Sequence, residues 1–248
     1  MGYLIMKVVI PVSYHDRILI DDFCNAVEFF GPYKEHELLV VCRPSDIKFG
    51  LEVFNRLCSL FFNPRIHMFE DDGPYGWPQG PNYYWKQTIE HLIKNKNELP
   101  WFWMELDCTP VKDNWLDLIQ EEYIKVGSKC LGMMQKISTL HGEDEHLVGV
   151  AVYAPDFGSI CESWKSIGDN SLAFDVHCQT EIVPMSTNSS IMSHHFRTSH
   201  YDCSNEGING KVKDSYNIKY NFDRPISEKS VMIHGCQDGS LARIITNT

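Results

Sequence analysis

The sequence of 248 residues contains no apolar run close to the ~20 residues that a membrane-spanning helix needs. Its first residues, MGYLIMK, lack the charged and then apolar order of a secretory signal peptide. No internal repeat, heptad pattern or low-complexity tract divides the chain. We therefore expect one domain over residues 1–248, located in the cytoplasm, with no membrane partner.

The sequence also lacks paired cysteines and an excess of basic residues. Its nine cysteines are scattered with no C-x-x-C, so neither a disulfide framework nor a zinc ribbon is predicted. Lys and Arg total 22 against 33 Asp and Glu, which gives a net charge of −11. Because duplex binding depends on neutralising phosphates, this balance excludes a protein that coats DNA in general.

Apolar runs alternate with segments of helical periodicity, which is typical of a parallel sheet covered by helices. The runs show no apolar–polar alternation, as expected of strands buried on both faces. We predict an α/β, Rossmann-like domain with a mostly parallel central sheet flanked by helices. The expected strands are 7–12, 37–42, 65–69, 101–106, 129–134 and 147–153, and the expected helices are 21–30, 49–61, 83–96, 114–126 and 161–167.

Polar clusters follow the first three expected strands, at residues 13–16, 43–46 and 70–73. The carboxyl ends of parallel strands meet at one edge of the sheet, where ligands bind in open α/β folds. These clusters therefore predict one binding site. Each of them is also explained as an ordinary turn, since Asp, Ser, Pro and Gly favour turns.

The segment Glu105-Leu106-Asp107 follows the fourth expected strand. Side chains at i and i+2 of an extended segment share a face, and two carboxylates so placed repel each other unless a cation lies beside them. Oxygen ligands of this kind suit Mg²⁺ or Mn²⁺. The alternative is a strand that simply ends in solvated acids.

The order of these features resembles that of GT-A-type, sugar-nucleotide-dependent glycosyltransferases over nearly the whole chain. Residues 7–16 resemble the opening strand and base-binding loop, and Glu105-x-Asp107 resembles the D-x-D motif with Glu in the first place. His234-Gly235 is similar to the late histidine that completes the metal site in many members. The other matching or donor-facing candidates are Pro11, Val12, Ser13, His15, Asp46, Asn82 at the start of a helix, and Trp77, whose ring could stack on a base or sugar.

The resemblance implies that residues 1–110 bind a nucleoside diphosphate sugar, probably a UDP-sugar, and that residues 111–248 form the acceptor side with a metal-completing loop near the C-terminus. It implies that Asp107 and His234 bind Mn²⁺ or Mg²⁺, and that Glu105 contacts the cation or the donor ribose. The acceptor is expected to be a hydroxyl group, on a hydroxymethylated DNA base of the phage type or on a glycan.

Asp175 lies in the apolar stretch Ala173-Phe174-Asp175-Val176, within the second half of the chain. Partial desolvation there would suit a general base that deprotonates the acceptor, which implies inversion at the sugar carbon. Glu181 and Asp156 are the other candidates, and a helix-capping role for Asp175 is the simpler explanation.

Two other functions remain open from the sequence. A sugar-phosphate nucleotidyltransferase would share the fold, but such enzymes usually have a glycine-rich loop after the first strand, and residues 13–17 contain no glycine. A non-catalytic nucleotide-sugar-binding module is favoured only by the replacement of Asp by Glu105.

Overall fold

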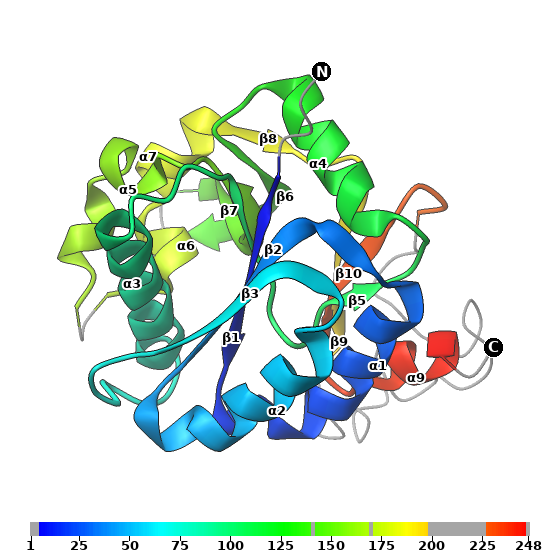
Figure 1. Cartoon of the computed structure of the whole chain (residues 1–248). Helices are drawn as coiled ribbons and strands as arrows, with labels where there is room; N and C mark the ends of the chain where they lie inside the picture. The colour runs from blue at the N-terminus through cyan, green and yellow to red at the C-terminus, as the bar shows by residue number, and fades with distance from the viewer. Residues whose placement is uncertain (1–4, 140–141, 169–170, 198–226, 247–248) are drawn as a thin grey trace, which may run out of the picture.

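The computed structural model describes residues 5–139, 142–168, 171–197 and 227–246. Its centre is a seven-stranded sheet in the order β3-β2-β1-β4-β7-β6-β8 (Figure 1). All neighbouring strands run parallel except β7, which is antiparallel to both β4 and β6. The strands are β1 (Lys7–Val12), β2 (Tyr33–Cys42), β3 (Phe61–Met68), β4 (Trp101–Trp103), β6 (Cys130–Thr139), β7 (Gly142–Tyr153) and β8 (Ser186–Asn188).

Helices cover both faces of this sheet, which explains the apolar runs of β1, β2, β4 and β7. On β1, Val8 and Ile10 pack in one core with α1 and α2, whereas Val9 packs in a second core with α3. Alternate residues of one strand therefore enter opposite cores. The first face carries α1 (Ile20–Phe30), α2 (Ile47–Leu57) and α4 (Trp115–Val126); the second carries α3 (Gln79–Lys94), α5 (Phe157–Ile160), α6 (Phe174–His177) and α7 (Gln179–Ile182).

A smaller three-stranded sheet lies beside the carboxyl end of β4. Its order is β5 (Thr109–Pro110), β10 (Met232–Cys236) and β9 (Met192–Arg197), with β10 antiparallel to β5 and parallel to β9. The last helix, α9 (Ser240–Thr246), packs against α1. This sheet brings the end of the chain next to the segment that follows β4.

The structure confirms the predicted fold class, with some differences in the elements. β4 ends at Trp103 instead of residue 106, and the helix expected at 161–167 is a short 3₁₀ turn, η3 (Ser163–Ser166). The other 3₁₀ turns are η1 (Tyr14–Leu19), η2 (Pro44–Asp46) and η4 (Val183–Met185). Within the described ranges, no helix is both long and apolar enough to cross a membrane.

Candidate metal centre

Glu105 and Asp107 lie on a turn and not on an extended strand. β4 ends at Trp103, one last hydrogen bond joins the N–H of Met104 to the carbonyl of Val9 of β1 at 2.9 Å, and the backbone N–H of Cys108 then donates to the carbonyl of Glu105 at 3.0 Å. The i, i+2 argument from an extended segment was therefore wrong in its geometry. The turn brings the two carboxylates together all the same.

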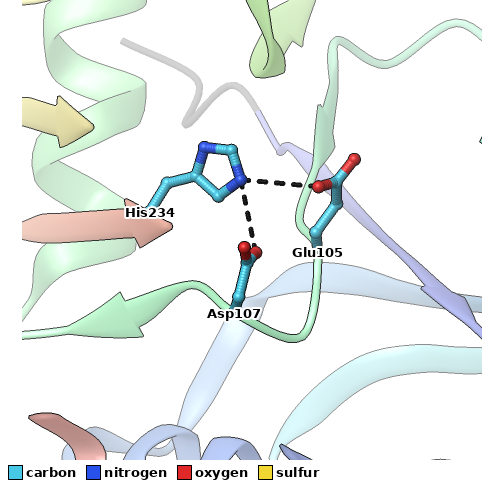
Figure 2. Close-up of side chains that lie close together, drawn as sticks. All are labelled: Glu105, Asp107 and His234. Carbon is cyan, nitrogen blue, oxygen red and sulfur yellow. Dashed lines mark ion pairs between the residues drawn. The ribbon is translucent and has the colours of Figure 1, made fainter. Parts of the chain in front are cut away.

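His234 joins these carboxylates from the other sheet. It lies within β10, so the late loop expected to carry it is a strand at this position. Its Nε2 atom is 3.4 Å from Oε2 of Glu105 and 3.3 Å from Oδ1 of Asp107 (Figure 2). One ligand atom from each of the three residues lies within 4.8 Å of the others.

Burial makes the charges of this group strongly interdependent. Burial alone would lower the pKa of His234, but the nearby carboxylates, Asp107 foremost, raise it to about 10. Burial alone would raise the pKa of Asp107, but the imidazole of His234 holds it below its usual value. Without a metal, the group is thus a buried carboxylate paired with an imidazolium.

The three side chains fit a divalent cation. Oδ1 of Asp107 is buried and no donor among the described residues is aligned to hydrogen-bond with it. Two carboxylates and one imidazole form an oxygen-rich donor set with one nitrogen, which suits Mn²⁺ and is less typical of Mg²⁺. Glu105 is more exposed than Asp107, and its Oε1 accepts a 3.1 Å hydrogen bond from the indole of Trp103.

His194 of β9 supports His234 from behind. The two Nδ1 atoms are 2.9 Å apart, and β9 and β10 run side by side in register at these residues. If Nε2 of His234 is a metal ligand, its ring proton lies on Nδ1 and is donated to His194, which fixes the tautomer. The sequence gave no reason to link His194 with His234, because the two residues lie far apart along the chain.

Asp16 is a further acid near the centre that the sequence analysis did not select. Burial raises its pKa to about 6, and the charges of Asp107 and Glu105 add to the increase, while a hydrogen bond from Ser13, 2.6 Å long, opposes it. The only signal for it was its place in the polar cluster after β1.

Asp46 is at the predicted edge, where it holds neighbouring segments together. It is 3% exposed, and its two oxygens accept hydrogen bonds from the backbone N–H of Tyr14 and the hydroxyl of Tyr84. The same Tyr84 hydroxyl lies 2.8 Å from the carbonyl oxygen of Val12. These contacts fix the end of β1 against α3.

The remaining donor-side candidates differ in accessibility. Trp77 is 78% exposed and His15 is exposed, whereas Ser13 and Pro11 are half-buried. Asn82 is buried at the start of α3, where its amide donates to the carbonyl of Leu172 and its Oδ1 has no partner among the described residues.

Asp175 lies on α6 and pairs with a histidine that the sequence analysis missed. Its Oδ2 is 3.7 Å from Nε2 of His146, a residue of β7, and both side chains are largely buried. Burial raises the pKa of Asp175 although His146 opposes the shift, and Glu105 is close enough to add to the increase. Asp175 therefore faces the same side of the sheet edge as the three metal-site residues.

No family model matches the sequence, and no curated protein matches it. Solved structures do match in fold. Mouse xyloside xylosyltransferase 1 has a TM-score of 0.52 and 9% identity, covering 94% of this chain and 98% of its own. The chain has the GT-A fold.

Two further GT-A structures agree with this assignment. The galactosyltransferase LgtC, solved with donor and acceptor sugar analogues, has a TM-score of 0.52 and 10% identity and covers 98% of this chain and 95% of its own. The bifunctional glycosyltransferase WbbM has a TM-score of 0.51 and 10% identity, covering 94% of this chain and 46% of its own. At such identities the likeness concerns the fold.

Proposed function

We propose that this GT-A chain is a metal-dependent glycosyltransferase that moves a sugar from a nucleoside diphosphate sugar to a hydroxyl acceptor. The observation that carries the proposal is the cluster of Glu105, Asp107 and His234 at the carboxyl edge of the parallel strands. Ligands of open α/β sheets bind at this edge. Oδ1 of Asp107, which is buried and has no aligned hydrogen-bond donor among the described residues, supports a cation there.

In this proposal Asp107 and His234 hold Mn²⁺ or Mg²⁺, and Glu105 contacts the cation or the donor ribose. When bound, such a cation stabilises the negative charge that develops on the leaving diphosphate. His194 keeps His234 in the ligating tautomer. Residues 1–110 bind the donor, most simply a UDP-sugar, and residues 111–248 form the acceptor side.

The donor-side residues divide by what they contact. His15 and Trp77 are exposed and able to reach a base or sugar, while Pro11 and Val12 end β1 and Ser13 directly precedes the 3₁₀ turn that carries His15. Asp46 and Asn82 act by positioning these segments, because the polar atoms of Asp46 and the amide of Asn82 are already bound within the protein. Their hydrogen-bond partners are Tyr14 and Tyr84 for Asp46, and Leu172 for Asn82.

Asp175 is the proposed general base for the acceptor hydroxyl. Its burial favours the proton-bound form, which brings its pKa closer to neutral and makes it a more effective base. The pairing with His146 orients the carboxylate. A single base opposite the leaving group implies that the product has the inverted anomeric configuration.

The test is calorimetry with UDP in Mn²⁺ and in EDTA, on the wild type and on Asp107→Asn. We expect UDP affinity to require Mn²⁺ and to fall in Asp107→Asn, while the same change at exposed Asp113 leaves it intact. Equal UDP affinity in Mn²⁺ and EDTA would refute the metal role.

Turnover then separates the candidate reactions. Sugar nucleotides are supplied with hydroxymethylated DNA or with glycan acceptors, and the products are identified. Release of free nucleoside diphosphate indicates sugar transfer, consumption of a nucleoside triphosphate with sugar phosphate indicates nucleotidyl transfer, and binding with no turnover for any acceptor indicates a binding module. Only the first outcome supports the proposal.

A further inference from the structure

A cavity of about 550 Å³ lies beside the amino-terminal end of β1, the middle of β2 and residues 63–67 of β3. The end of α3 and residues 95–99 form its other wall. Cavities that hold small organic ligands are typically about 300–1,000 Å³. Because the metal centre lies beyond the carboxyl ends of the same strands, this cavity is a separate site.

The wall of the cavity changes from apolar to charged. Leu39 and Leu92 are buried in the core beneath it, whereas Lys7 and Glu37 stand opposite each other on β1 and β2. Glu37 is already neutralised, since its carboxylate lies 3.5 Å from the ammonium of Lys7 and accepts a 2.8 Å hydrogen bond from Asn63.

Two cations of the cavity have no acidic partner among the described residues. Arg65 is exposed on β3 and its only hydrogen bond there is a 3.4 Å contact with Asn63. Lys96 is exposed beyond the end of α3. The acid Glu98 also lines the cavity, so its three cations (Lys7, Arg65 and Lys96) outnumber its two acids (Glu37 and Glu98) by one. A net positive charge thus gathers here in a chain of net charge −11.

Two stacked imidazoles, those of His67 and His91, also line the cavity near these cations. The rings of His67 and His91 are 3.8 Å apart and inclined by 28°. Burial lowers the pKa of His91 to about 4, with further lowering by His67, Lys7, Lys94 and Arg65. Burial and Lys94 also lower the pKa of His67, against a smaller opposing effect of Glu70. A bound anion would favour the protonated form of both rings and so raise their pKa values.

We propose that this cavity binds a small phosphorylated organic molecule, with its phosphate on Arg65 and Lys96 and its organic part against the half-buried side chains of Ile66 and Leu99. A dianionic phosphate matches two unpaired cations, and the planar guanidinium of Arg65 can hold it through two parallel hydrogen bonds. The inference does not depend on the proposed sugar transfer.

The experiment is calorimetry with inorganic phosphate and phenyl phosphate in EDTA, which keeps divalent metal away from the other site. We expect phenyl phosphate to bind more tightly than inorganic phosphate, because its ring covers apolar surface. The variant Arg65→Ala/Lys96→Asn should weaken both by about tenfold or more, since each loses a charged contact. Asn is chosen at position 96 because the backbone there has φ +50°.

A matched control is Lys125→Asn, which removes one exposed charge from α4. It should leave both affinities unchanged. In NMR titrations, phenyl phosphate should raise the pKa of His67 and His91 in the wild type and in the control, but not in the double variant. Unchanged affinity in Arg65→Ala/Lys96→Asn would overturn the proposal. So would imidazole pKa values that stay the same when phenyl phosphate is added, or a failure of phenyl phosphate to bind the wild type at millimolar concentration.

Discussion

If Mn²⁺ binds at His234 as proposed, it competes with a proton for this ring, and the competition predicts how Mn²⁺ affinity depends on pH. In the metal-free protein, the carboxylates of Asp107 and Glu105 outweigh burial and raise the pKa of His234 to about 10. A metal ligand must be the neutral imidazole, so binding of Mn²⁺ releases one proton from this ring. Asp107 releases none, because its pKa lies below the usual value of a carboxyl group.

The size of the effect follows from the distance between the pKa and the working pH. At pH 7 the proton weakens Mn²⁺ binding by about 1,000-fold relative to the deprotonated ring, and each added pH unit recovers about tenfold. Between pH 7 and pH 8.5 we therefore expect Mn²⁺ affinity to rise by about thirtyfold. Titration followed by the electron paramagnetic resonance signal of free Mn²⁺ measures this directly.

Two variants separate this explanation from a general effect of pH. His234→Gln removes the competing proton and should bind Mn²⁺ weakly with little pH dependence over this range. His91→Gln changes an imidazole at the opposite edge of the sheet and should keep the wild-type slope. A flat wild-type profile, or the same slope in His234→Gln, would refute the reasoning.

Substitutions at three further positions test other parts of the structure. His194→Phe should lower Mn²⁺ affinity by about 10–100-fold, and His194→Gln should restore part of it, because its amide oxygen accepts the Nδ1 proton of His234. Asp175→Asn should slow sugar transfer by about 10²–10⁴-fold and spare UDP binding, as measured by turnover and calorimetry; wild-type turnover would contradict its role as a base. Gly149→Ala should lower the free energy of unfolding by about 1–3 kcal/mol, because the added Cβ would lie 2.4 Å from the buried ring of Phe174. The loss is measured as a lower melting temperature, and an unchanged one would show that the ring of Phe174 moves aside.

The sequence was most informative where burial alone determines structure. The apolar runs that became β1, β2 and β7 are buried on both faces, and helical periodicity found α1 to α4 to within a few residues. Glu105 and Asp107 were found because the E-x-D spacing is local.

Contacts between distant segments could not be predicted in this way. β8 and β9 are short and polar, and they become strands only because β6 and β10 offer them hydrogen bonds. Nothing local distinguishes His146 or His194 from other histidines, since their partners Asp175 and His234 lie elsewhere in the sequence. The extent of β4 was overestimated because Met104 and Leu106 are buried while outside the strand.

The placement of His234 on β10 has a consequence for the order of events during synthesis. The last strand of the main sheet, β8, ends at Asn188, so every strand of this sheet is synthesised before β10. Glu105 and Asp107 are synthesised earlier still. Domains can begin to fold during synthesis, so the sheet is able to assemble before its last ligand exists. Cation binding by the full set must wait for β10 to align between β5 and β9. The main sheet can therefore fold before the proposed metal centre is complete.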